Sequence, residues 1–165
     1  MSYNWKQFTK RIPIDVPAPM IYQAWTTQSG LESWFLREAI FKDANGQQKP
    51  PDAPIHKGDQ YRWRWYGHPD SVEESRSIID ANGRDALSFT FSGNCMVTVT
   101  IKHDGEMNIC ELVQTNFPAE EVDKISLYTE CATGWTFYLA NLKSVLEGGL
   151  DLRNRNNSIK NVISS

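Results

Sequence analysis

The sequence is poor in the residues that form covalent or metal cross-links. It holds three cysteines, which form no CxxC pair and leave one thiol over in any disulfide scheme: Cys95, Cys110 and Cys131. This usage is typical of small, reduced core residues. Its three histidines are scattered along the chain, with no second ligand at zinc spacing. We therefore expect reduced cysteines, no metal site and no cofactor.

Positive charge and long apolar runs are also scarce. The chain has 17 Lys and Arg residues against 20 Asp and Glu residues, a net charge of −3 at pH 7. A nucleic-acid binder needs a basic patch or stripe, so this balance argues against nucleic acid as a partner. No run approaches the ~20 apolar residues of a membrane span, and residues 1–11 lack the apolar core of a signal peptide. We therefore expect no membrane span and a cytoplasmic protein.

Tryptophan is what the chain has in excess. Aromatic residues make up 12% of its 165 residues, and 6 of them are Trp. The length fits one domain, because single domains cluster at ~100–150 residues. We assign residues 1–149 to this domain. The polar residues 150–165, which are rich in asparagine, are expected to form a loosely held tail.

Two short helices are predicted near the start of the chain. Proline is tolerated in a first helical turn, and three prolines precede or open the first helix. The buried face of that helix is expected to hold Met20, Ile21, Ala24 and Trp25. Ser29 is the expected cap of the second helix, which turns Leu31, Trp34 and Phe35 inward.

Alternating apolar and polar residues predict six or seven strands. We expect them at residues 5–14, 38–42, 60–66, 71–81, 87–91, 95–101 and from 107 to about 117. Asn82-Gly83 and Asp104-Gly105 mark turns, because these residue types accept a positive φ. Short loops between consecutive strands predict an antiparallel sheet.

A polar stretch, residues 43–59, interrupts this run of strands. It carries three prolines and two glycines. Connections beyond ~12–15 residues without regular structure are uncommon and are usually functional or disordered. The stretch is either a flexible hairpin loop or a flap over a binding site.

The clearest element is a long C-terminal helix. It begins after Pro118 among acidic residues, which suit the positive end of the helix dipole, and Gly148-Gly149 ends it. Apolar residues recur at helical spacing: Val122, Ile125, Tyr128, Cys131, Trp135, Tyr138, Leu142, Val145 and Leu146. Such a helix is about 40 Å long. Gly134 marks either a close approach of this helix to the sheet or room for a ligand beside Trp135.

These elements predict an α+β fold, with a curled antiparallel sheet wrapped around one long C-terminal helix. A helix of ~10–12 Å diameter cannot fill a sheet curled that widely. Either bulky side chains fill the remaining space or a cavity stays open between helix and sheet. Trp63, Trp65 and Trp135 are placed to line such a cavity for a flat ligand, or to plug it.

The residue pattern from Phe8 to Glu147 is similar to that of a known family. It is carried by Val16-Pro17-Ala18, Tyr22, Ala24-Trp25-Thr26, Leu31-Glu32-Ser33-Trp34-Phe35, Gly58-Asp59 and Gly134-Trp135, with Leu139, Leu142, Leu146 and Glu147 at the close. This pattern resembles the helix-grip superfamily (START-like, SRPBCC, Bet v-type). Within it, the chain resembles the homologues of the activator of the heat-shock-protein-90 ATPase. The resemblance implies the helix-grip fold, with a deep apolar cavity between the sheet and the long helix.

Members of this superfamily bind lipids, sterols, polyketides and plant hormones, and a minority are enzymes. The resemblance therefore implies binding of a small apolar ligand, lipid-like or aromatic, in the cavity. The expected lining residues are Trp34, Phe35, Trp63, Trp65, Phe89, Phe91, Val97, Tyr128, Cys131, Trp135 and Tyr138. One alternative is a chaperone as partner, bound through the protein surface. Another is an enzyme of the cyclase or hydratase type that uses the cavity as a reaction chamber.

No catalytic residue is assigned, and the sequence favours a binding protein over an enzyme without deciding between them. It has no nucleophile elbow, phosphate loop or metal cluster. The family pattern often places a His late in the strand before the long helix, where this chain has Gln114. Glu111 and Glu130 fit surface positions better than catalytic ones. Three arginines are expected either to pair with Glu73 and Glu74 across strands or to anchor an acidic ligand head group: Arg62, Arg64 and Arg76.

Overall fold

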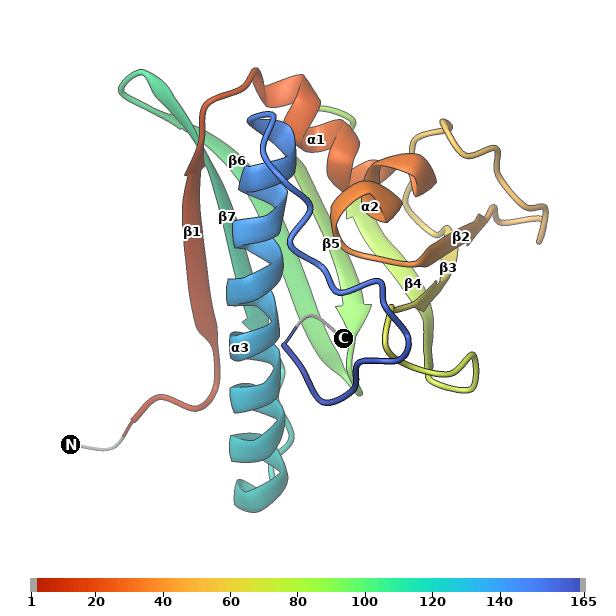
Figure 1. Ribbon diagram of the computed structural model, residues 1–165. Coiled ribbons are helices and arrows are strands. Elements are labelled where there is room, and N and C mark those ends of the chain that lie inside the picture. The colour runs from red at the N-terminus through yellow and green to blue at the C-terminus, as the bar shows by residue number, and fades with distance from the viewer. Residues whose placement is uncertain (1–2, 164–165) are drawn as a thin grey trace.

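The computed structural model describes residues 3–163, which form one sheet and three helices. In chain order the elements are β1 (Phe8–Ile14), α1 (Ala18–Thr26), α2 (Gln28–Trp34), β2 (Glu38–Lys42), β3 (Gln60–Arg64), β4 (Glu73–Ala81), β5 (Ala86–Phe91), β6 (Cys95–Asp104), β7 (Met107–Thr115) and α3 (Glu121–Leu146). The seven strands pair antiparallel in the order β1-β7-β6-β5-β4-β3-β2. Figure 1 shows α3 across one face of this sheet, with α1 and α2 covering its upper end. The predicted α+β helix-grip fold is confirmed.

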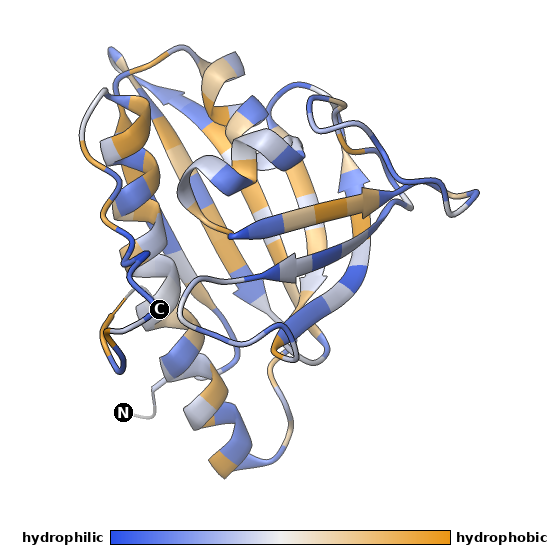
Figure 2. Ribbon diagram, turned by 45° about the vertical axis from the view of Figure 1, so that its right-hand side comes forward, coloured by the Kyte–Doolittle hydropathy of each residue, from blue (hydrophilic) through white to orange (hydrophobic). Residues whose placement is uncertain are grey.

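The central strands bury one face, as their alternation predicts. Phe89 on β5 lies opposite Val97 on β6, and Leu87 lies opposite Val99. All four side chains are at most 3% exposed. Figure 2 shows apolar and polar residues alternating along these strands. A register shift in β4 between Ile78 and Asp80 adds a local bend, and such irregularities increase the curl of a sheet.

Two turns form where the sequence places them. The Asn82 side-chain oxygen accepts hydrogen bonds from the backbone amides of residues 84, 85 and 86 at 2.9–3.0 Å. This closes the connection from β4 to β5. Gly105 has a φ of +63° in the turn between β6 and β7, a conformation that glycine adopts without steric cost. Both turns keep consecutive strands adjacent in the sheet.

The long helix spans most of the predicted segment, but its first turn is exposed. Glu121 and Asp123 occupy that turn, and Gly148, with a φ of +82°, follows its end. Tyr128, Trp135 and Leu142 on its inner face are buried. The prediction that Val122 shares this face is wrong, because Val122 is 81% exposed. The first turn of α3 projects beyond the end of the sheet, so nothing covers it there (Figure 1).

The second helix is capped two residues earlier than the sequence suggests. The Thr27 hydroxyl accepts a hydrogen bond from the Gly30 amide at 2.9 Å, so Thr27 is the N-cap of α2 and the assignment to Ser29 is wrong. Ser29 instead donates to Asp52 at 2.8 Å. Met20, expected on the buried face of α1, is 46% exposed.

Within residues 43–59, only the second half is held against α1 and α2, where the Ser29 amide donates to the Pro51 carbonyl at 3.0 Å. The first half forms a turn after β2, in which the Asp43 amide donates to the Gln47 carbonyl at 2.9 Å. The Lys49 ammonium donates to the Asp59 carboxylate at 2.6 Å and to the Pro54 carbonyl at 2.7 Å. The Ile55 amide donates to the Thr26 carbonyl at 2.8 Å, and the Ile55 side chain is buried. Within residues 3–163, no helix is long and apolar enough to cross a membrane.

Candidate functional site

Aromatic rings fill the deepest part of the space between helices and sheet. Trp25, Trp34 and Trp63 are each at most 1% exposed. The ring centroids of Trp25 and Trp34 lie 4.7 Å apart, and those of Trp63 and Phe89 lie 5.1 Å apart. Such edge-to-face ring pairs add about 0.5–1.5 kcal/mol each beyond the burial of their area. The deep interior is therefore a packed core.

A pocket stays open nearer the surface, between α3 and the sheet. Its volume is about 200 Å³. It is lined by Phe35, Trp65, Phe91, Ser92, Leu127, Glu130, Cys131, Gly134, Trp135 and Tyr138. A dry engineered cavity of ~150 Å³ accepts benzene, so this pocket has room for one or two rings. We call it the aromatic pocket.

Six of the eleven lining residues expected from the sequence border this pocket: Phe35, Trp65, Phe91, Cys131, Trp135 and Tyr138. The other five lie elsewhere. Trp34, Trp63, Phe89 and Val97 belong to the packed core, each at most 1% exposed. Tyr128 packs against Phe8 at 5.1 Å and Phe117 at 5.2 Å. The two alternatives for the tryptophans thus apply to different residues, because Trp65 and Trp135 line the opening while Trp63 plugs the core.

Four residues of the pocket wall are absent from the expected lining: Ser92, Leu127, Glu130 and Gly134. One of the two interpretations of Gly134 nevertheless gives room for a ligand beside Trp135, and a helical signal for Leu127 is also present. Residues 127, 131, 134 and 138 follow the i, i+4, i+7, i+11 spacing of one helical stripe. That stripe flanks the buried stripe through Trp135 and borders the pocket together with Trp65 and Phe91, which stand at the ends of β3 and β5.

Four rings of the aromatic pocket hold one another in place. Phe35 contacts Trp65 at a centroid distance of 5.8 Å and Trp135 at 5.0 Å. Phe91 contacts the same two tryptophans at 6.3 Å and 5.3 Å. Each ring therefore touches two others in a closed circuit. This circuit fixes the shape of the pocket before any ligand enters.

Gln114 orients one of these rings. The Trp135 indole Nε1 donates a hydrogen bond to the Gln114 side-chain oxygen at 2.8 Å, and both side chains are buried. Burial raises the pKa of the Cys95 and Cys131 thiols, and the polar Gln114 side chain beside them partly opposes the rise. Gln114 thus acts as a positioning residue for Trp135.

Gly134 faces open space, so the interpretation of a close helix–sheet approach is wrong. A Cβ atom built on Gly134 meets no atom within 4 Å. The residue borders the aromatic pocket on one side and an outer groove of α3 on the other. Glycine therefore leaves room next to Trp135.

Replacing Gly134 with alanine is expected to raise the free energy of unfolding by about 0.5–1 kcal/mol, because glycine costs a helix interior about that much. The change is measured as a shift in the midpoint of urea unfolding, with the slope of the unfolding free energy against urea concentration unchanged. Gly148→Ala is the matched control and should destabilise the protein, because Gly148 has a positive φ. A loss of stability in Gly134→Ala would show that the space beside Trp135 is filled.

Of the charged groups considered from the sequence, Glu130 borders the pocket and the others lie away from it. Glu111 forms ion pairs with Arg11 at 3.1 Å and Lys102 at 2.7 Å, so it is not a base within the cavity. The arginines pair with carboxylates of β2 and β4: Arg62 with Glu38, Arg64 with Glu73, and Arg76 with Glu74. Within residues 3–163, no three His, Cys, Asp or Glu side chains form a group that could hold a metal ion.

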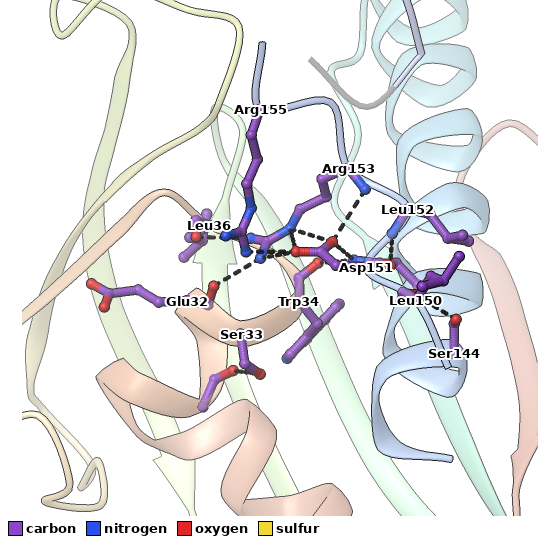
Figure 3. Close-up of polar contacts among 12 residues, drawn as sticks. Glu32, Ser33, Trp34, Leu36, Ser144, Leu150, Asp151, Leu152, Arg153 and Arg155 are labelled. Carbon is purple, nitrogen blue, oxygen red and sulfur yellow. Dashed lines mark hydrogen bonds and ion pairs between the residues drawn. The ribbon is translucent and has the colours of Figure 1, made fainter. Parts of the chain in front are cut away.

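The start of the C-terminal tail is anchored beside the pocket. The Arg153 guanidinium donates to the Leu36 and Glu32 carbonyls at 2.9 Å and to the Asp151 carboxylate at 2.8 Å (Figure 3). The Arg153 side chain is 1% exposed. Asn141 of α3 donates to both the Trp34 carbonyl and Asp151. This anchor clamps the connection from α2 to β2, which carries Phe35, and it departs from the loosely held tail that the polar composition predicts.

The anchor gives folding stability a dependence on pH. Burial alone would raise the pKa of Asp151, but hydrogen bonds from Arg153 and Asn141 lower it well below its ordinary value. A carboxyl whose pKa is lower in the folded state stabilises the fold above its unfolded pKa of about 3.9 and loses that effect as the pH falls further.

We therefore expect Asp151→Asn to be less stable than the unchanged protein at pH 7, with a gap that narrows below about pH 4. Urea unfolding at pH 7, 4 and 3 measures the free energy of unfolding of the Asp151→Asn variant and of the unchanged protein. Asp123→Asn, on the exposed first turn of α3, is the control and should show a much smaller change. A gap that stays constant from pH 7 to pH 3 would contradict the role given to the Asp151 carboxylate.

Solved structures of other proteins share this fold. Protein SSP2350 from Staphylococcus saprophyticus superposes with a TM-score of 0.69 at 17% identity, covering 89% of this chain and 96% of that one. The Aha1 dimer from Colwellia psychrerythraea superposes with a TM-score of 0.66 at 19% sequence identity, covering 87% of this chain and 97% of that one. CalU16 from Micromonospora echinospora superposes with a TM-score of 0.63 at 15% sequence identity, covering 88% of this chain and 77% of that one. At these identities the likeness shows the fold alone.

The family comparison extends the likeness to sequence. No curated protein matches this chain. One family model, described as Activator of Hsp90 ATPase homolog 1-like protein, matches residues 15–147. The matched range runs from the end of β1 to the end of α3, so it contains every residue that lines the aromatic pocket. The resemblance stated from the sequence is confirmed, and the chain belongs to the Activator of Hsp90 ATPase homolog 1-like family.

Proposed function

We propose that this protein binds a small apolar molecule with one or two rings in the aromatic pocket. The observation that carries the proposal is the pocket of about 200 Å³ that five aromatic rings line between α3 and the sheet. Ligand sites are concave, mostly apolar and largely preformed. The closed circuit of ring contacts meets the last condition, because no side chain has to be ordered on binding.

The size of the pocket favours flat rings over long lipid chains. Ligand sites of ~300–1,000 Å³ take drug-sized molecules, and this pocket is smaller. Burial of apolar area contributes ~25 cal/mol per Å² before the cost of ordering the ligand. A small ring that fills the space completely therefore binds better than a chain of which only one end enters.

The proposal is tested by thermal shift and calorimetry with indole, 2-naphthol and dodecanol. We expect indole and 2-naphthol to raise the melting temperature and dodecanol to have a smaller effect. Gly134→Leu should abolish the shift, because its side chain enters the open space at the pocket wall. Gly134→Ala is the matched control, since both substitutions remove the helix penalty of glycine. If no ring compound binds, the proposal fails.

The family description favours a second candidate function, contact with a chaperone ATPase. Such contact would use the protein surface, so it should not depend on the open pocket. The test measures the ATPase rate of a purified heat-shock-protein-90 chaperone with and without this protein. Equal stimulation by the unchanged protein and by Gly134→Leu supports this function, and an unchanged rate removes it.

A further inference from the structure

We infer that the aromatic pocket selects organic cations, specifically amines carried on one or two aromatic rings, over neutral and anionic molecules of the same shape. This inference rests on the proposed function and narrows it to one ligand class. It follows from the charge of the pocket wall and from the kind of surface that the wall presents.

The wall carries a single negative charge. Glu130 stands at the exposed rim, where Ser126 donates to its carboxylate at 3.4 Å. Burial raises the pKa of Tyr138 to about 12 and raises that of the Cys131 thiol, so both side chains are neutral at pH 7. Glu130 is thus the one charged lining residue at that pH, and no Lys, Arg or His belongs to the lining.

Two cations close to the site are engaged elsewhere. Arg153 acts on Tyr138 electrostatically, but its guanidinium is 1% exposed and bonded to Asp151 and two backbone carbonyls. Arg64, one residue before Trp65, pairs with Glu73 at 3.0 Å. A carboxylate ligand would therefore meet the rim carboxylate and find no free cation within the lining.

The aromatic wall favours a cation independently of Glu130. The face of an aromatic ring is electrically negative, and indole attracts cations more strongly than phenyl or phenol rings do. Two indoles, Trp65 and Trp135, stand on the wall with Phe35 and Phe91 between them. An aryl ring that enters the pocket would leave an ammonium group on a short chain at the rim, beside Glu130 and these rings.

Three probes with the same ring and chain length test the inference. Tryptamine, tryptophol and indole-3-propionate carry an ammonium, a hydroxyl and a carboxylate group at pH 7. By isothermal titration calorimetry we expect tryptamine to bind about three- to tenfold more tightly than tryptophol, because an exposed ion pair and a cation–π contact are each worth up to ~1 kcal/mol. Indole-3-propionate should bind most weakly.

Glu130→Gln should reduce the preference for tryptamine over tryptophol to threefold or less. It should not weaken tryptophol binding. Glu106→Gln, in the turn between β6 and β7, is the matched control and should leave the preference unchanged. Raising the salt concentration should reduce the preference, since exposed charges are screened. Tryptophol binding that equals or exceeds tryptamine binding overturns the inference and leaves the proposed function standing. If none of the three probes binds, the proposed function fails as well.

Discussion

Replacement of Arg153 with alanine is expected to lower the free energy of unfolding by about 3–5 kcal/mol, the range for breaking a buried ion pair by removing one partner. The change leaves the Leu36 and Glu32 carbonyls without the bonds that Arg153 donates and leaves Asp151 with a weaker set of partners. For a chain of this length, the melting temperature should fall by roughly 6–20 °C.

Arg155 provides the control for this experiment. It reaches the same Asp151 carboxylate at 2.6 Å, but its side chain is 54% exposed. An exposed pair contributes ~0–1 kcal/mol, so Arg155→Ala should shift the melting temperature only slightly. Equal effects of the two substitutions would contradict the claim that burial and the two carbonyl contacts make Arg153 the anchor.

Replacement of Trp135 with alanine is expected to cost about 3–5 kcal/mol of stability, as for other large-to-small core changes. It should also abolish ring binding in the aromatic pocket. The indole is 2% exposed and contacts Phe35, Phe91 and Trp25. Its removal opens the ring circuit and also frees the buried Gln114 oxygen. Urea unfolding measures the first effect, and calorimetry with indole well below the lowered melting temperature measures the second.

A second pair of variants separates the ring from its hydrogen bond. Trp135→Phe keeps an aromatic wall but leaves the Gln114 oxygen unpaired, which costs about 1–3 kcal/mol. Adding Gln114→Leu to Trp135→Phe should recover part of that loss, because replacing both partners of a bond by apolar groups is close to neutral. If the double variant is less stable than Trp135→Phe alone, Gln114 has a role beyond positioning Trp135.

The fold could be predicted from the sequence because period and turn chemistry act locally. Alternation along residues 87–91 and 95–101 gives the buried face of two paired strands, and Asn82-Gly83 gives the turn before them. The errors lie at element ends. Val122 is exposed because α3 extends beyond the sheet, and helical spacing carries no information about where the covering layer stops.

The aromatic pocket could be predicted only in part, because how deeply a side chain is buried does not follow from its neighbours in the sequence. Trp63 and Trp65 are two residues apart, about 7 Å along a strand. One is packed under Phe35 and Phe89, while the other stands at the pocket opening beside Phe91. The strand pattern tells which face each residue takes but not how far the helix reaches over it.

The anchor was beyond sequence reasoning for a related physical reason. The polar composition of residues 150–165 indicates weak packing on average, but a single arginine decides how the segment is held. Arg153 finds its partners 117 and 121 residues earlier in the chain, at the end of α2. Contacts at such separation depend on the finished fold.

The central claim is that the aromatic pocket of this chain receives a ring-shaped ligand, and the most direct measurement is a tryptophan side-chain NMR titration. Indole N–H resonances of all six tryptophans are followed as unlabelled tryptophol is added to isotope-labelled protein. The account predicts saturable shifts for Trp65 and Trp135, with little change for Trp5, which packs against Tyr128 away from the pocket. Saturation confined to Trp5, or resonances that do not move at all, would contradict it.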